Sequence, residues 1–424
     1  MHAQDGEQGV VIPAIETASS TAAIRSLGRW GVRTVVVSEY DNPPGFRSRY
    51  CDERVRVPDP AVDMAGYEQA LLSLAEREDI DTILPFREAD VYALARNRDE
   101  FAEYVGTPWP DIDRLRRVQD RIELRDAATA AGVAIPQTET LDEWGSWNSP
   151  CVVKPRYTVH APEYAARFGE PAPELGSTTY VPPGAEPDAD AITERMGHVP
   201  IVQEYLPTTD EYGFFAQYKE GTPVATFQHR QRRGWKYAGG PSAYRESVSI
   251  PELEAAGTAL LDELDWHGVA MVEFLRNPDT GEFELMEINP RFWSSLPFTV
   301  QAGVDFPHLY WLQATGRALP DPPGYSVGIG GHLLRGEALH LYSILSEEYP
   351  LVERPSFLGT AREVGRSLLR ERRFDYLSRD DPGPMVGELE LTVRSGLAEV
   401  LDGSRERVST ASKGIAAQLF SHNR

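Results

Sequence analysis

The sequence predicts an α/β protein in which a parallel sheet near the start is followed by antiparallel strands. Residues 10–37 alternate apolar strand patterns with a helical pattern, the order that builds a parallel sheet. Later, strand patterns at 269–275 and 282–293 flank residues 277–281, Asn-Pro-Asp-Thr-Gly, whose composition suits a β-hairpin turn. With 424 residues the chain is expected to form more than one compact unit, because single cores rarely exceed about 250–300 residues.

The first 110 residues are predicted to alternate strands and helices, with a strand at 10–15, a helix at 19–27, strands at 32–37 and 80–85, and a helix from 87 to 95. No GxGxxG sequence occurs there, so dinucleotide binding is not expected. The loop at 16–21 is rich in Ser and Thr, whose hydroxyls could orient a polar substrate.

Two sequence features indicate boundaries between structural units in the rest of the chain. An amphipathic helix is predicted at 115–131, ending at Gly132 with Pro136 beyond it. The Pro-rich residues 318–325 indicate a linker. We therefore expect four units, at residues 1–110, 111–206, 207–318 and 319–424.

The composition is that of a strongly acidic globular protein, with 41% hydrophobic residues and a formal charge of −23. This acidity argues against a nucleic-acid partner, because binding the phosphate backbone needs basic stripes. No apolar run approaches the ~20 residues of a membrane span, and no signal peptide is visible, so we expect a cytoplasmic protein without a membrane partner. The two cysteines, Cys51 and Cys151, lack any spacing typical of zinc or redox sites.

Lysine is scarce, since Lys154, Lys219, Lys236 and Lys413 are the only lysines and every other basic position is arginine. Acidity combined with scarce lysine suggests the hypothesis of a salt-adapted protein. Lys154 lies within the apolar strand pattern Pro-Cys-Val-Val-Lys-Pro-Arg, where a compact ammonium suits a phosphate oxygen. The ordinary alternative is a strand-end lysine that reaches solvent.

Residues 282–293, EFELMEINPRFW, are the most informative stretch for function. In an extended strand alternate side chains share a side, so Glu287, Asn289 and Arg291 are predicted to lie together. Met286 and Ile288 are then expected to point into the core.

Pairing across the hairpin would bring Glu273 close to Glu287. Glu and Asn oxygens are hard ligands that Mg²⁺ prefers, and Arg291 could bind a phosphate oxygen. The sequence therefore predicts a metal and phosphate site. The alternative is that both glutamates lie on the solvated face of an antiparallel sheet.

Residues 226–242 are the most basic stretch of this acidic chain and could bind an anion, although a solvated loop is the alternative. The stretch contains His229, Arg230, Arg232, Arg233 and Lys236, followed by Gly239 and Gly240, which permit a close backbone approach to a ligand.

The strand glutamate Glu273, the hairpin, and the sequence Glu-Ile-Asn-Pro-Arg followed by residues 292–307 resemble the metal-binding end of the ATP-grasp superfamily. Residues 229–242 are similar to a branch described as carboxylate-amine ligases. The resemblance implies a Rossmann-like amino-terminal domain, a two-part α/β ATP-grasp domain whose smaller part is a lid, and a carboxy-terminal extension.

The resemblance also implies a role for each site residue. ATP would lie between the two parts of the grasp domain, with residues 199–207 as the adenine hinge and the Gln203 side chain accepting from the exocyclic amine. The nucleotide-binding residues would be Arg121, Lys154, Gln203, Glu204, Tyr205, Leu206, Asp210 and Glu211. Mg²⁺, or alternatively Mn²⁺, would be held by Glu273, Glu287 and Asn289. Lys154, Arg230 and Arg291 would be the catalytic cations, and His229, Arg232, Gly239, Gly240 and Ser242 would contact substrate.

Two positions depart from the superfamily pattern. Arg121 stands where a lysine commonly binds phosphate, and Arg alters the geometry of that contact. Residues 157–180 stand where a glycine-rich flap is common, but they contain only Gly169 and Gly176. In the extension, His340 is expected to be a packed or surface residue rather than half of an acid/base pair with Asp375.

On this resemblance the protein would be a ligase that converts a substrate carboxylate to an acyl phosphate with ATP, so that attack by an amine gives an amide. Its partners would be a small-molecule carboxylate and amine, and a homodimer is one expected assembly. Two alternatives stay open: a carboxylase or kinase-like phosphoryl transfer enzyme, and a non-catalytic ATP-binding protein.

Overall fold

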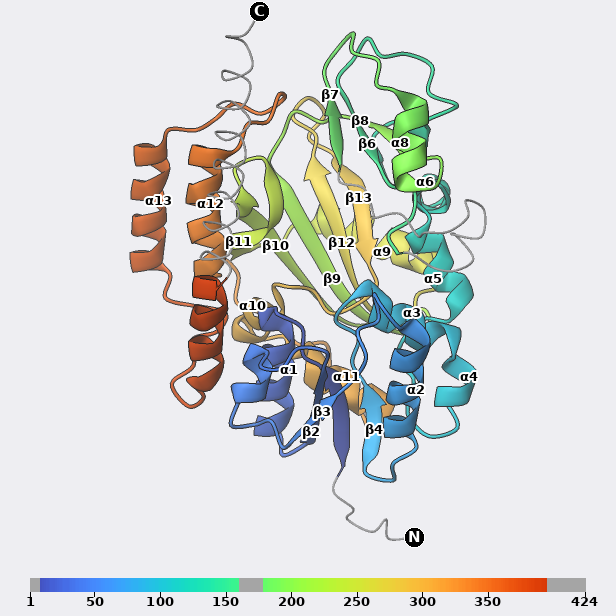
Figure 1. Cartoon of the computed structure of the whole chain (residues 1–424), viewed down its shortest axis with the longest axis vertical. Helices are drawn as coiled ribbons and strands as arrows, with labels where there is room; N and C mark the ends of the chain where they lie inside the picture. Colours follow the sequence, from blue (N-terminus) through green and yellow to red (C-terminus); the bar gives the residue numbers. More distant parts are fainter. Residues whose placement is uncertain (1–7, 160–177, 395–424) are drawn as a thin grey trace, which may run out of the picture.

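The computed structural model describes residues 8–159 and 178–394 and contains three sheets (Figure 1). A blue amino-terminal sheet lies at the bottom of the view, a larger sheet lies at the centre, and a small sheet in green lies at the top. In these described parts no helix is long and apolar enough to cross a membrane.

The amino-terminal sheet is parallel and confirms the α/β class predicted from the sequence. Its strands, in the order β3-β2-β1-β4, are β1 (Gly9–Pro13), β2 (Arg33–Ser38), β3 (Glu53–Arg56) and β4 (Ile80–Ile83). The helices beside it are α1 (Ala18–Arg29), α2 (Met64–Ala75), α3 (Glu88–Arg96) and the short α4 (Arg98–Phe101), with the 3₁₀ turn η1 (Pro44–Arg47). β1 is buried throughout and β2 almost so, as expected of inner parallel strands. The sequence analysis did not predict β3, which is an edge strand with little buried surface.

The predicted helix at 115–131 is wrong in one respect, because the chain forms two helices there, α5 (Ile112–Gln119) and α6 (Arg121–Ala130). Asp120, between them, has extended backbone angles and its side chain accepts a hydrogen bond from the N–H of Ile122. An aspartate favours such a cap over the helix interior. Asp120 also pairs with Arg156 at 2.7 Å, and the break places Arg121 at the first position of α6.

The part of the chain that is expected to be a lid, and is called the lid below, forms a four-stranded antiparallel sheet with its own small core. Its order is β5-β8-β6-β7, formed by β5 (Thr138–Thr140), β6 (Cys151–Lys154), β7 (Thr179–Val181) and β8 (Ile201–Glu204), with α8 (Ala189–Met196) beside it. Residues 160–177, which include most of the stretch expected to replace a flap, lie outside the described residues.

The central sheet is antiparallel, and α9 (Pro251–Glu263) packs on one of its faces. In the order β13-β12-β9-β10-β11-β14 it contains β9 (Glu211–Lys219), β10 (Thr222–Lys236), β11 (Gly239–Ser247), β12 (Gly268–Arg276), β13 (Phe283–Asn289) and β14 (Gly330–His332). The hairpin predicted around 277–281 is confirmed, with Glu273 opposite Glu287.

One detail of this hairpin corrects the sequence analysis. The register shifts after Glu273, so that Phe274 pairs with Leu285 and Met286 is an extra residue. Met286 therefore lines a cavity rather than the core, whereas Ile288 is buried as predicted. The bulge also returns Glu287 to the cavity side, next to Met286.

The carboxy-terminal part packs on both larger units. Helices α10 (Leu296–Ala302) and α11 (Phe306–Ala314) share a core with the amino-terminal sheet. Helix α12 (Leu334–Ser346) packs against β10 and β11, and α13 (Phe357–Arg370) packs against α12 (Figure 1). A final helical segment, 383–394, follows. Arg25 of α1 pairs with Asp381 at 2.8 Å, so the extension closes back on the start of the chain.

Candidate active site

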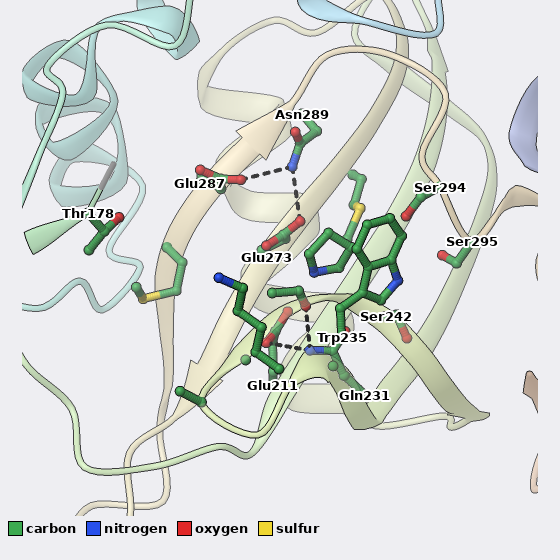
Figure 2. A pocket seen from close by; sticks show the side chains of 18 of the residues that line it. Thr178, Glu211, Gln231, Trp235, Ser242, Glu273, Glu287, Asn289, Ser294 and Ser295 are labelled. Atoms are coloured by element: carbon green, nitrogen blue, oxygen red, sulfur yellow. Dashed lines mark hydrogen bonds between the residues drawn. The ribbon is translucent and has the colours of Figure 1, made fainter. Parts of the chain in front are cut away.

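A cavity of about 1620 Å³ lies between the lid, the central sheet, the amino-terminal sheet and the carboxy-terminal extension, and Figure 2 shows part of its lining. Most of the site residues predicted from the sequence line it: Arg121, Lys154, Glu204, Tyr205, Leu206, Glu211, His229, Arg232, Gly239, Gly240, Ser242, Glu273, Glu287, Asn289 and Arg291. Three predicted residues, Gln203, Asp210 and Arg230, do not line it.

Two carboxylates face each other at the centre of this cavity. Glu273 of β12 and Glu287 of β13 are direct cross-strand partners, and the side-chain amide of Asn289 donates to both, at 3.0 Å and 3.3 Å (Figure 2). Burial, and then the charge of Glu287, raise the pKa of Glu273 well above its ordinary value. Burial opposes ionisation of Glu287 too, but Arg121 and Lys154 bring its pKa below its ordinary value.

The chemistry of these groups fits a divalent cation. Like charges directly opposite each other on neighbouring strands are unfavourable by themselves, and carboxylate oxygens are the ligands Mg²⁺ prefers. Within residues 8–159 and 178–394, no three His, Cys, Asp or Glu side chains form a metal cluster, so the candidate set is two acids and one amide. The Oδ1 atom of Asn289 accepts from Arg291 at 2.6 Å, and the amide would have to turn before that oxygen could meet a cation.

Three cations surround the carboxylates. Arg121 donates to Oε2 of Glu287 at 3.0 Å and to the carbonyl of Pro155 at 2.8 Å. Arg291 donates to Glu88 at 3.1 Å. Lys154 lies close enough that its charge stabilises ionised Glu287. The site is thus a compact arrangement of paired charges in which an anionic ligand could displace a carboxylate from a cation.

Gln203 has a different place from the one predicted. Its Oε1 atom accepts from Nζ of Lys154 at 2.8 Å, and its amide donates to Thr138 at 2.9 Å. Burial, and then the charge of Arg121, lower the pKa of Lys154 to about 8. Gln203 therefore holds Lys154 rather than facing the cavity.

Arg230 lies on the opposite face of β10 from its neighbours His229 and Gln231, because adjacent strand residues point to opposite sides. Its guanidinium pairs with Asp210 at 2.5 Å and lies over the ring of Tyr212. The geometry thus separates Arg230 and Asp210 from the other predicted residues.

His229 is buried in the cavity wall, and its Nε2 lies 3.1 Å from the hydroxyl of Ser295. Burial, and then the charge of Arg245, lower the pKa of His229 to about 3, so the imidazole is neutral near pH 7. Its role is therefore that of a neutral hydrogen-bonding group.

Several lining residues were missed by the sequence analysis. Gln231 donates to Glu211 at 2.8 Å, and burial together with Glu287 raises the pKa of Glu211 to about 7. Period-two alternation from His229 could have identified Gln231. The carboxy-terminal extension contributes His340, Val352, Pro355, Thr360 and Glu363, for which no local sequence signal exists.

No known family model matches the sequence, and no curated protein matches it. Many solved structures have a similar fold. The N5-carboxyaminoimidazole synthetase from Staphylococcus aureus, complexed with ADP, is 14% identical with a TM-score of 0.54, over 75% of this chain and 80% of that one. The biotin carboxylase from Campylobacter jejuni, in a β-γ-ATP complex, is 15% identical with a TM-score of 0.54, over 76% and 74%.

A third structure is the biotin carboxylase domain dimer of the 2-oxoglutarate carboxylase from Hydrogenobacter thermophilus, in complex with MgADP, ADP and bicarbonate. It is 13% identical with a TM-score of 0.54, over 77% of this chain and 74% of that one. These neighbours are ATP-grasp enzymes. At such low identity the likeness shows the fold, and the chain has the ATP-grasp fold.

Proposed function

We propose that the protein is an ATP- and Mg²⁺-dependent ligase that activates a carboxylate as an acyl phosphate and couples it to an amine. The observation that carries the proposal is the opposition of Glu273 and Glu287 beside Arg121 and Lys154 in one cavity. Mg²⁺ is usually bound by one or two carboxylates together with the phosphates of a nucleotide. The complexes with ADP and MgADP among the structures of similar fold support this assignment.

The cavity has room for more than a nucleotide. Its volume of about 1620 Å³ exceeds the roughly 300–1,000 Å³ of ordinary ligand pockets. We place adenine near the main chain of Glu204 and Leu206, and the phosphates toward Arg121 and Lys154. The second substrate then lies between β10 and the start of α1, where Thr17 and Ser19 line the cavity; residues 18–21 are therefore helical and not part of the predicted loop at 16–21.

In the proposed reaction a carboxylate oxygen of the substrate attacks the γ-phosphorus of ATP, and ADP leaves. The amine nitrogen then attacks the acyl carbon, and inorganic phosphate leaves with the bond electrons. Mg²⁺ held by Glu273, Glu287 and Asn289 would neutralise part of the negative charge of the phosphates. Arg121, Lys154 and Arg291 are fixed cations that stabilise the transferring group in a preorganised site, and no covalent protein nucleophile is needed.

A second candidate is an ATP-dependent carboxylase. Structures of similar fold include an N5-carboxyaminoimidazole synthetase and a domain complexed with bicarbonate. In that case bicarbonate would take the place of the carboxylate as phosphoryl acceptor. The assembly proposed with either function is a homodimer, which the molecular mass in solution tests.

The deciding experiment is ADP release by purified protein with Mg²⁺ in high salt, with pools of amino acids and small carboxylates offered singly and in pairs, and with bicarbonate. Release that requires a carboxylate and an amine together supports ligation. Dependence on bicarbonate supports carboxylation. ATP binding without turnover under any pool would favour a nucleotide-binding protein instead.

A further inference from the structure

Four tyrosines from distant parts of the chain meet beside the cavity, and three of them line it. We refer to Tyr180, Tyr205, Tyr237 and Tyr349 as the tyrosine cluster. Tyr180 lies 6.1 Å from Tyr205 and 6.3 Å from Tyr349, and Tyr237 lies 5.0 Å from Tyr349, all with edge-on ring geometry. Tyr180 belongs to β7 of the lid, whereas Tyr349 belongs to the α12–α13 connection. The cluster therefore joins the lid to the carboxy-terminal extension.

Hydrogen bonds hold this connection, residues 347–355, in place. The hydroxyl of Tyr205 donates to the carbonyl of Leu351 at 3.3 Å. The hydroxyl of Tyr237 donates to the carbonyl of Glu347 at 3.3 Å and lies 3.2 Å from the N–H of Tyr349, which donates to it. Backbone bonds of this kind fix the path of the chain. Figure 1 shows the connection above α12 and α13, toward β7.

The same connection lines the cavity. Val352 and Pro355 border it together with Tyr205 and Leu206, the residues that follow β8. Residues 347–355 thus stand at the end of the cavity where the proposed function places the adenosine.

We propose that residues 347–355 are part of the nucleotide site and that packing of Tyr349 on Tyr180 slows release of a purine nucleotide. The inference rests on the proposed function, because it requires that the cavity bind a nucleotide. A ligand enclosed between lid and sheet leaves when the lid opens, and opening must separate Tyr180 from Tyr349. Each aromatic pair adds stability beyond its buried area, so the closed state persists longer.

The lid contact can be tested without nucleotide. Amide hydrogen exchange of β7, in nucleotide-free protein, should be faster in Tyr349→Ala than in the wild type, because β7 loses its contact with the extension. Tyr342→Ala is the matched control, since Tyr342 lies on α12 in the same extension and is 54% exposed. Equal protection of β7 in wild type and Tyr349→Ala would overturn the proposed coupling, even if the cavity bound nucleotide.

The effect on release is measured by displacing a fluorescent N-methylanthraniloyl-ADP with excess ADP and Mg²⁺. We expect ADP to dissociate about three- to tenfold faster from Tyr349→Ala than from the wild type. This ratio corresponds to the stabilisation that one or two aromatic contacts provide. Tyr349→Phe keeps the ring and should release within about twofold of the wild type, and Tyr342→Ala should be unchanged.

Wild-type dissociation rates in a folded Tyr349→Ala variant would refute the role in release. So would equal acceleration by Tyr342→Ala, which would indicate a general loss of stability. If the wild type bound no nucleotide, the proposed function and the role in release would fall together, while the exchange data would still decide whether the cluster holds the lid.

Discussion

The ammonium of Lys154 donates a 2.8 Å hydrogen bond to Oε1 of Gln203, which itself donates to Thr138. Replacing Gln203 by Leu would leave a buried ammonium with its acceptor removed, at a cost of about 1–3 kcal/mol. We expect the pKa of Lys154 to fall further and ADP affinity to drop about fivefold or more, measured by calorimetry. Gln137→Leu, at an exposed glutamine, is the control. Unchanged ADP affinity in Gln203→Leu would show that Lys154 does not depend on this contact.

Glu287→Gln should lower turnover by about two orders of magnitude or more while the fold is kept, because it removes one of the two carboxylates expected to hold the metal. Mg²⁺-dependent tightening of ADP binding should be lost in parallel, and this readout needs no second substrate. Glu282→Gln, at an exposed position of the same hairpin, should behave as the wild type. Near-native turnover with metal still bound would contradict the assignment of the site.

Arg291 and Arg230 are expected to differ, although the resemblance gave both a catalytic role. Arg291 lines the cavity, so Arg291→Gln should reduce ADP release at least about tenfold. Arg230 is bound to Asp210 on the other face, in a partly exposed pair of a kind worth about 0.2–1 kcal/mol. Arg230→Gln should therefore leave turnover within about threefold. A large loss of turnover in Arg230→Gln would contradict the placement of Arg230 outside the active site.

The hairpin could be predicted from sequence because its signals are local. Residues 277–281 have turn chemistry, and period-two alternation placed Glu287 and Asn289 on one side. The position of Met286 could not be predicted, because a bulge depends on how the neighbouring strand pairs. By the same alternation rule, the adjacent residues His229 and Arg230 cannot both face the cavity. The sequence alone could therefore have excluded one of the two from the site.

The contribution of the carboxy-terminal extension could not be predicted. Val352 lines the cavity. Its segment is held by Tyr205, which bonds to Leu351, and by Tyr237, which packs on Tyr349, and both tyrosines lie more than 100 residues away in the chain. Such contacts depend on the packing of α12 against β10 and leave no periodic pattern in the sequence. The helix break at Asp120 was not predicted for a different reason. In an amphipathic pattern, a capping aspartate cannot be distinguished from any other polar residue.

The raised pKa of Glu388 should make the free energy of unfolding decrease as the pH rises. Burial raises its pKa to about 7, with Glu16 and Asp375 adding to the rise and Arg335 opposing it. Between its ordinary pKa of about 4.5 and 7, the folded state keeps a proton that the unfolded state has lost, so the free energy of unfolding decreases with pH over that window.

Glu388→Gln should remove this slope. The variant should exceed the wild type by about 1–3 kcal/mol at pH 8 and match it near pH 4.5, in denaturant titrations. Glu390→Gln is the control, because Glu390 is exposed in an ion pair with Arg47 and its pKa is lowered, so its substitution should not stabilise at pH 8. An unchanged slope in Glu388→Gln would show that Glu388 ionises normally.

The formal charge of −23 predicts that the folded state needs salt. Like charges repel in the compact state, and the Debye length falls from about 10 Å at 0.1 M to about 3 Å at 1 M, so added KCl weakens this repulsion. We expect the melting temperature to rise steadily from dilute buffer to molar KCl. Neutralising the exposed Glu100 and Glu103 with Gln should reduce the dependence on salt, because fewer charges then need screening. A melting temperature that is the same in dilute buffer and in molar KCl would rule out salt adaptation.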